Sequence, residues 1–340
     1  IMNKLKKIIA LGTSIITAGM MIMGCCDDKD TSDDTSAFIT IEDTTISLDV
    51  GKIYAYNQQA SYEAYYLANG YNIDWSMAYE EGSETSVQDL VKEEVVDRIK
   101  MFYVVAQYAK DHGATLSDED NEEIKGYVEN YLKSNPKVLA ATGATEDVLY
   151  EIYELEAFYN KGCDMLFEND DFSVDEAELR QSHVYAVEIN DSMVDFPKDT
   201  AKAILQRVQA GEDIKTVANA YGIQATEGNV GRGDFEGDAV ENLCLSLATG
   251  ESDIVEEDGN YLVVYCINSN DEEATTLAIE DKVRSMKQEK IIEYYKDLSK
   301  DLKITVNEDL WSTITFTTPI FTEDDLTDIL NDLSINKDID

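Results

Sequence analysis

The sequence predicts an α+β protein in which a mostly helical, discontinuous domain is interrupted by an inserted α/β domain. Hydrophobic residues follow a mainly helical period from residue 39 to residue 171. The period changes after a charged junction at 172–178, where short strands begin to alternate with helices. A long amphipathic helix returns at 272–302. We therefore expect residues 39–171 and 272–316 to fold together, with residues 179–269 as a separate inserted domain.

The N-terminal segment, residues 1–24, has the features of a secretory signal. Basic "NKLKK" precedes an uncharged apolar stretch that is short for a membrane span of about 20 residues. "IMGC" then resembles a bacterial lipobox, with Gly24 before the cleavage site and Cys25 as the lipidated residue. The alternative is an uncleaved anchor helix. Either way, we expect the bulk of the chain outside the cytoplasm, with residues 25–38 as an acidic flexible tether to the bacterial cell membrane.

The charge balance narrows the range of partners. The chain has 27 Lys and Arg residues against 70 Asp and Glu, a formal charge of −43. Such a surface repels nucleic-acid phosphates, so we expect no nucleic-acid partner. Cys163, Cys244 and Cys266 have no metal-ligand spacing, and neither a metal nor a cofactor is implied. Cys244 and Cys266 lie in apolar contexts typical of core thiols, with a disulfide between them as the alternative.

The first domain reads as a short strand followed by helices. "TTISLDV" (44–50) is the strand. Ser86 is a suitable N-cap for the next clear helix and Gly113 a suitable stop, while Ser117 caps a further helix. Thr145–Gly162 forms another, and residues 303–316 add strand-like sequence after the return helix. The amphipathic face of the helix after Ser86 is marked by Val91, Val95, Ile99, Phe102 and Ala106.

Two outer features have two interpretations each. A tyrosine-rich region either belongs to the core and surface of the first helices or lines a groove for unfolded segments. The acidic tail, residues 317–340, either docks on the body through a short amphipathic helix or is disordered. The aromatic residues concerned are Tyr54, Tyr56, Tyr62, Tyr65, Tyr66, Tyr71, Tyr79 and Trp75, and the apolar tail residues are Leu326, Ile329, Leu330 and Leu333.

The inserted segment resembles a parvulin domain, the small peptidyl-prolyl isomerase fold. Its phrases occur in the family's order over about ninety residues: "SHVYAVEI", "AKAILQRVQAGEDIKTVANAYG", "GNVGRGDF" and "LSLATGESDIVEEDGNYLVVYCI". The resemblance implies an antiparallel sheet flanked by helices. From the pattern we expect strand 182–189, helices 198–210 and 212–221, a glycine-rich loop, a short helix near 239–247, and strand 260–267.

The outer segments extend the resemblance to PrsA-type foldase lipoproteins, whose helical part is similar to that of SurA. In that family the N- and C-terminal segments fold together as a chaperone domain that holds unfolded secreted chains. The resemblance covers residues 1 to about 315 and leaves the acidic tail outside it. It implies unfolded or partly folded secreted proteins as partners and the membrane as a partner through the lipid on Cys25, and it leaves a homodimer open.

The resemblance also implies a site for turning X–Pro bonds. Rotation about such a bond crosses a barrier of about 18–20 kcal/mol without a covalent step. Parvulins use two neighbouring histidines, a polar Cys or Asp, and an apolar slot for the proline ring. Here His183 matches the first histidine, Tyr261 stands in place of the second, and Gln224 falls near the polar position. The proline slot is assigned to Val230, Phe235, Val240 and Leu245.

The predicted function is therefore a membrane-tethered foldase with a partly degenerate isomerase site. The alternative is a catalytically inactive holdase, or a structural lipoprotein that uses the fold only for binding. His183 has its own alternative, a structural histidine bonded to Tyr261 or to backbone. His112 is expected to be a helix-end residue. The acidic run Asp118–Glu122 is expected to start a helix rather than bind calcium, and Arg232–Asp234 to belong to the glycine-rich loop.

Overall fold

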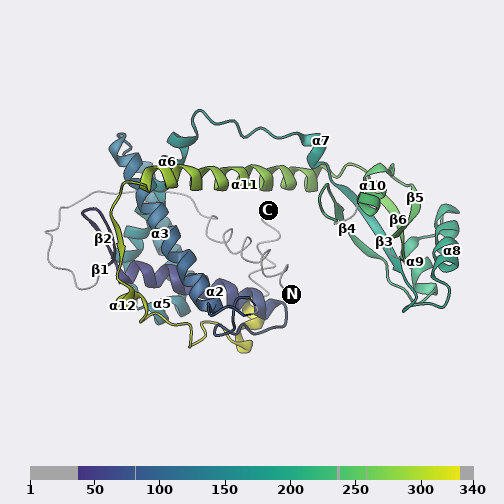
Figure 1. Ribbon diagram of the computed structural model, residues 1–340, viewed down its shortest axis with the longest axis horizontal. Coiled ribbons are helices and arrows are strands. Elements are labelled where there is room, and N and C mark those ends of the chain that lie inside the picture. Colours follow the sequence, from purple (N-terminus) through teal and green to yellow (C-terminus); the bar gives the residue numbers. More distant parts are fainter. Residues whose placement is uncertain (1–36, 81, 236–237, 258, 330–340) are drawn as a thin grey trace. The chain divides into compact units, whose positions relative to one another are not determined.

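The computed structural model describes residues 37–80, 82–235, 238–257 and 259–329, which form two compact units. The expected signal peptide, Cys25 and most of the tether lie outside the described residues. Among the described residues, the first unit takes 37–169 and 291–329, and the second takes 170–290 (Figure 1). Helices and small antiparallel sheets occur in both, and the expected α+β class is confirmed.

A three-stranded sheet joins the two segments of the first unit. Its strands β1 (Ala37–Ile41), β2 (Thr44–Ser47) and β7 (Ile304–Val306) lie in the order β2-β1-β7, with both neighbouring pairs antiparallel. Because β7 comes from the far end of the chain, its pairing with β1 closes the unit. The other elements are α2 (Leu48–Ala68), α3 (Val87–Asp111), α4 (Asp118–Ser134), α5 (Pro136–Thr142), α6 (Glu146–Phe167), α12 (Glu308–Trp311) and the 3₁₀ turn η1 (Glu323–Asp325).

Polar caps set where these helices begin. Ser86 and Ser117 each form a capping box, with Asp89 and Asp120 as the reciprocal partners. Ser47 accepts a hydrogen bond from the Val50 amide and caps α2, so the strand predicted over 44–50 ends at Ser47. The expected strand was three residues too long because the apolar residues after Ser47 belong to the first turn of a helix.

Gly162 allows α3 and α6 to approach closely rather than ending α6. A Cβ atom at this position would lie 2.5 Å from the carbonyl oxygen of Val105 on α3. The helix continues through Gly162 to Phe167. The predicted stop at this glycine was therefore wrong, since only a residue without a side chain fits between the two backbones.

The core of the first unit contains much of the tyrosine-rich region. Tyr54, Tyr62 and Trp75 are buried, while Tyr71 is 68% exposed. Phe38 of β1 stacks on Trp311 at a centroid distance of 5.0 Å. Buried residues of β1, α2, α3, α4, α6 and the segment around Trp311 form one continuous cluster. The core interpretation therefore holds for several of these aromatic residues.

The second unit is built on a four-stranded antiparallel sheet. Its strands are β3 (Ser182–Ile189), β4 (Thr226–Val230), β5 (Ser252–Glu257) and β6 (Asn260–Asn268), in the order β4-β3-β6-β5. The helices are α7 (Glu176–Leu179), α8 (Pro197–Gln209), α9 (Ile214–Ala220) and α10 (Asp238–Ser246). The expected strand 182–189 is confirmed, and the predicted helices match to within a few residues. Part of the expected glycine-rich loop is strand β4, and β5 was not predicted as a strand.

Helices cover both faces of this sheet. Val187, Ile189 and Val263 pack against α8 and α9. The alternate residues Val184 and Val264 pack against α10 on the other face. Alternation of side chains along each strand therefore separates two small cores. Cys244 and Cys266 lie buried in the second of these cores as free thiols.

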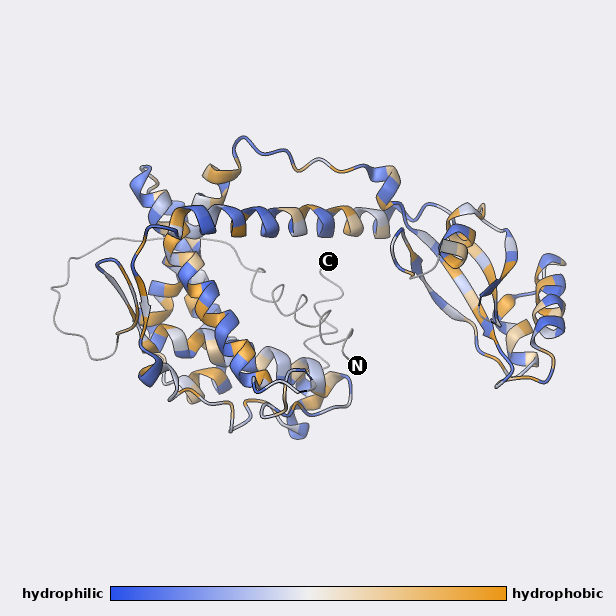
Figure 2. Ribbon diagram, viewed as in Figure 1, coloured by the Kyte–Doolittle hydropathy of each residue, from blue (hydrophilic) through white to orange (hydrophobic). Residues whose placement is uncertain are grey.

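The long return helix, α11 (Glu272–Ser299), contributes residues to both units. Hydrophilic and hydrophobic residues alternate along it (Figure 2). Ile291 is its buried residue, while Leu277 is 51% exposed. In the part of the chain that the structure describes, no helix is both long and apolar enough to cross a membrane.

Candidate functional site

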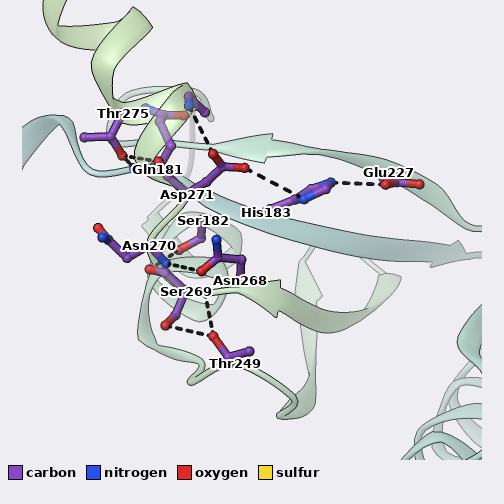
Figure 3. Close-up of polar contacts among 11 residues, drawn as sticks. Gln181, Ser182, His183, Glu227, Thr249, Asn268, Ser269, Asn270, Asp271 and Thr275 are labelled. Atoms are coloured by element: carbon purple, nitrogen blue, oxygen red, sulfur yellow. Dashed lines mark hydrogen bonds and ion pairs between the residues drawn. The ribbon is translucent and has the colours of Figure 1, made fainter.

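His183 lies near the start of β3 between two carboxylates. Its Nε2 atom is 3.2 Å from Glu227 Oε1 on β4, and its Nδ1 atom is 3.8 Å from Asp271 Oδ2 after β6 (Figure 3). The side chain is 28% exposed. On the backbone ladder His183 faces Asn229 and Asn268. The imidazole is therefore held at the surface of the sheet by acidic groups from both sides.

Lys215 and Tyr185 complete the group around Glu227. The Lys215 ammonium is 3.0 Å from Glu227 Oε2 and lies over the Tyr185 ring, 4.2 Å from its centroid. Hydrogen bonds from Tyr185 and Lys215 lower the pKa of Glu227, with a smaller contribution from the charge of His183. We call His183, Glu227, Asp271, Lys215 and Tyr185 the His183 cluster. The Glu227 carboxylate is therefore kept ionised.

Asp271 connects the His183 cluster to the start of α11. Its backbone amide donates to the Gln181 carbonyl at 2.9 Å, and its carboxylate accepts from the Ala274 amide at 3.1 Å. The Gln181 amide in turn donates to the Thr275 hydroxyl at 3.0 Å (Figure 3). These bonds tie the beginning of β3 to the first turn of α11, which is a structural role. The acid–base groups of the cluster are thus one imidazole and two flanking carboxylates, and the nearby Thr275 hydroxyl donates to the Asp271 carbonyl oxygen.

Tyr261 does not reach His183. It pairs with Ile189, six residues along β3 from the histidine, which corresponds to roughly 20 Å at about 3.3 Å per residue. Its hydroxyl bonds to Glu256, and this bond is the main cause of its raised pKa. The structural alternative in which Tyr261 bonds His183 is therefore wrong, and so is the pairing of the two as neighbouring catalytic groups.

Gln224 lies at the same distant end of the sheet. It is exposed in the loop before β4, two residues ahead of Thr226, which pairs with Ala186. Asn229, the partner of His183 on that strand, is five positions further along. The structure therefore does not bring Gln224 to His183.

Two of the residues assigned to the proline slot lie on the other face of the sheet. Val230 and Val240 are buried together with Cys244 and Val264. Val230 faces Ser182 on the ladder, so its side chain points to the face opposite that of His183. Phe235 is 41% exposed, and Leu245 is half-buried with its carbonyl oxygen accepting a bond from Arg180 at 2.7 Å. Two slot residues thus meet, but in a core rather than beside the histidine.

The other features noted in the sequence have structural explanations. His112 is the C-cap of α3, with Nδ1 2.8 Å from the Tyr108 carbonyl oxygen. Asp120 belongs to the capping box of α4 and pairs with Lys161 at 3.0 Å. Arg232 pairs with Glu178 at 3.1 Å. Among the described residues there is no group of His, Cys, Asp and Glu side chains that could hold a metal ion.

A hollow that the sequence did not reveal lies beside Tyr261. It has a volume of about 440 Å³ and is lined by the loop between β3 and α8, by the first turn of α8, and by Gly259 and the start of β6. Phe196 in this loop is 71% exposed, and nearby Met193 is 51% exposed. Asp191, Asp195 and Asp199 supply three acidic groups along the lining, against one basic group from Lys198. The available signal in the sequence was a phenylalanine directly before Pro197, a proline that begins a helix.

No family model and no curated protein matches the sequence. PrsA from Bacillus subtilis is similar at 16% identity over 70% of this chain and 97% of that chain, with a TM-score of 0.23. A peptidylprolyl isomerase (PrsA) from Bacillus cereus is similar at 17% identity over 76% and 98%, with a TM-score of 0.30. A SurA-like chaperone structure from Campylobacter jejuni is similar at 10% identity over 80% and 99%, with a TM-score of 0.26.

Proposed function

We propose that this chain is an extracytoplasmic chaperone of the PrsA type that binds unfolded secreted proteins, and that its parvulin-like unit binds clients without isomerising them. The ordered parvulin phrases of the sequence support the family assignment. The separation of His183 from Tyr261, Gln224, Val230 and Val240 supports the binding role and is the observation that carries this proposal. A twisted prolyl bond has to meet an apolar slot and polar groups at one place.

The hollow beside Tyr261 is the client-binding surface that we assign to the second unit. Phe196 and Met193 offer exposed apolar area, and the three aspartates around the hollow attract basic residues. A basic, partly apolar segment of an unfolded protein therefore fits this surface. The excess of acidic residues elsewhere repels an anionic membrane surface, so the loaded chaperone does not adsorb to it.

The anchor completes the proposal. Cleavage before Cys25 and its lipidation would keep the protein at the outer face of the cytoplasmic membrane, where secreted chains emerge unfolded. Two or more acyl chains give stable attachment, whereas one does not. The acidic tether would then let both units reach clients near the membrane. It ends earlier than expected from the sequence, because Ala37 and Phe38 belong to β1 and Phe38 is buried in the core.

Suppression of aggregation tests the binding role. The purified protein should keep reduced lysozyme, a basic unfolded client, from aggregating at a few-fold molar excess. Phe196→Ser should weaken this suppression several-fold, because it removes the exposed ring of the hollow. Leu277→Ser is the matched control, since it removes another exposed apolar side chain of the same unit, on α11. Equal suppression by all three proteins would show that the hollow does not bind clients. Absence of suppression by the unmodified protein would refute the chaperone assignment.

A further inference from the structure

The C-terminal segment 317–329 lies against the surface of the first unit. It follows Phe316 of the core and is largely without regular structure up to η1. Ile320 is 7% exposed and packs with Ala60 of α2 and Val138 of α5. Ile329 is also buried, at 6% exposure. The docked interpretation of the tail is therefore correct for its described part, which we call the C-terminal strap.

The strap is held mainly through its backbone. Glu63 of α2 is buried, and its Oε2 atom accepts hydrogen bonds from the amides of Ile320 at 2.7 Å and Phe321 at 2.9 Å. Gln59, one turn earlier, donates to the Thr318 carbonyl oxygen at 2.9 Å. Backbone amides and carbonyls are the same in every polypeptide, so these contacts recognise an extended chain without reading its sequence.

Glu63 and Gln59 are themselves fixed in place. Gln59 Nε2 lies 2.7 Å from Glu63 Oε1, and the Trp75 indole N–H donates to the same oxygen at 3.2 Å. Both side chains are almost fully buried, at 0% for Gln59 and 4% for Glu63. Gln59 Nε2 and the two Glu63 carboxylate oxygens thus form a row of hydrogen-bonding atoms on α2, directed at the chain that lies over them.

The outer contacts of the strap are polar and exposed. Lys137 of α5 pairs with Asp325 and lies over the Phe321 ring, 5.6 Å from its centroid. Asn72 donates to Glu323 at 3.3 Å. Surface ion pairs and exposed hydrogen bonds of this kind contribute little to stability. The strap is therefore anchored by the buried side chains of Ile320 and Ile329 and by backbone bonds, while its polar outer contacts are weak.

We propose that the surface formed by Tyr56, Gln59, Ala60, Glu63 and Val138 is a client-binding groove and that the C-terminal strap occupies it as an internal competitor. This inference rests on the proposed chaperone function. The occupant that competes with the strap is an extended segment of an unfolded protein with one buried aliphatic residue at the position of Ile320. An apolar pocket beside sequence-independent backbone contacts suits clients of varied sequence.

Competition by the strap lowers the apparent affinity for clients. Client binding requires the fraction of molecules in which the groove is open, so the apparent dissociation constant rises as that fraction falls. Opening the strap should therefore tighten client binding without creating any new contact. If one molecule in ten is open at rest, complete opening gains about tenfold.

Ile320→Asp in the full chain tests this proposal. A buried aspartate next to Glu63 cannot be accommodated, so the strap should leave the groove. Affinity for fluorescently labelled, reduced and carboxamidomethylated lysozyme should rise about tenfold, and a labelled peptide with the sequence of residues 317–329 should bind the variant but not the unmodified protein. Thr327→Asp is the matched control, because it adds the same charge at an exposed position of the strap.

A second variant guards against misfolding of the first. Lys137→Ala removes the outer ion pair and leaves the core untouched, so it should raise client affinity by about two- to threefold. If the unmodified protein suppresses aggregation but neither Ile320→Asp nor Lys137→Ala changes client affinity, the strap proposal is refuted. If the unmodified protein binds no client at all, the proposed function itself fails.

Discussion

Glu156 should make the stability of the first unit depend on pH in an unusual direction. Its side chain on α6 accepts a hydrogen bond from the Tyr54 hydroxyl at 3.1 Å. Desolvation of the carboxyl raises its pKa from 4.5 to about 7, although the bond from Tyr54 and the charge of Arg98 oppose the rise. The folded state therefore binds this proton more tightly than the unfolded state does. Stability from this group is complete below about pH 4.5 and falls as the pH rises to about 7.

The size of the effect follows from the shift. A difference of 2.5 pKa units between 4.5 and about 7 corresponds to roughly 3 kcal/mol at 1.36 kcal/mol per unit. Glu156 is half-buried rather than fully buried, so solvent screening reduces this to about 2 kcal/mol. Glu156→Gln keeps an acceptor for Tyr54 and has no charge to desolvate. The variant should be more stable than the parent by about 2 kcal/mol at pH 8 and by much less at pH 5.

Urea unfolding at pH 5 and pH 8, followed by tryptophan fluorescence, measures this difference. Glu151→Gln is the matched control, because Glu151 on the same helix also accepts a tyrosine hydroxyl bond, from Tyr103 at 2.8 Å, but is exposed. Glu151→Gln should change the stability at pH 8 by less than Glu156→Gln does, because its side chain is exposed. A Glu156→Gln variant that is equally or less stable than the parent at pH 8 would refute the reasoning.

Three further substitutions test the packing and capping described above. Gly162→Ala should destabilise the protein by about 1–2 kcal/mol in thermal unfolding, because the clash with Val105 outweighs the gain of about 1 kcal/mol in helix propensity; a stabilised variant would contradict the close approach. Ser117→Ala should cost about 1 kcal/mol through loss of the capping box, measured by urea unfolding, and Ser117→Asp should retain most of it. His183→Ala should cost about 1 kcal/mol or less, because its contacts are half-exposed, and a loss above about 3 kcal/mol would show that the cluster is more deeply structural.

Local signals in the sequence were sufficient to predict most of the helices and strands. Ser86 and Ser117 each precede an acidic residue by three positions, a pattern that predicts the start of a helix. The structure has a capping box at both places. The alternation in "SHVYAVEI" defines β3, whose two faces are buried under different helices. These features depend on neighbours a few positions apart, so a single sequence contains them.

Contacts between distant segments could not be predicted in the same way. Glycine often ends a helix, so the sequence alone indicated a helix end at Gly162. Its actual role depends on the close approach of α3, which a single sequence does not reveal. The tail docks because Glu63, more than 250 residues earlier, offers acceptors to Ile320 and Phe321. The register between β3 and β6 also determines which residues meet at the candidate site. Tyr261 aligned with a family histidine, but pairing with Ile189 places it at the far end of β3 from His183.

The central claim is that the parvulin-like unit binds without catalysing prolyl isomerisation. Its most direct test is the isomerisation rate of a series of Xaa–Pro tetrapeptides, including acidic and basic residues before proline, with the unmodified protein beside His183→Ala. The account predicts rates equal to the uncatalysed rate for both proteins across the whole series. Acceleration by the unmodified protein that is lost in His183→Ala would contradict it and make His183 a catalytic residue.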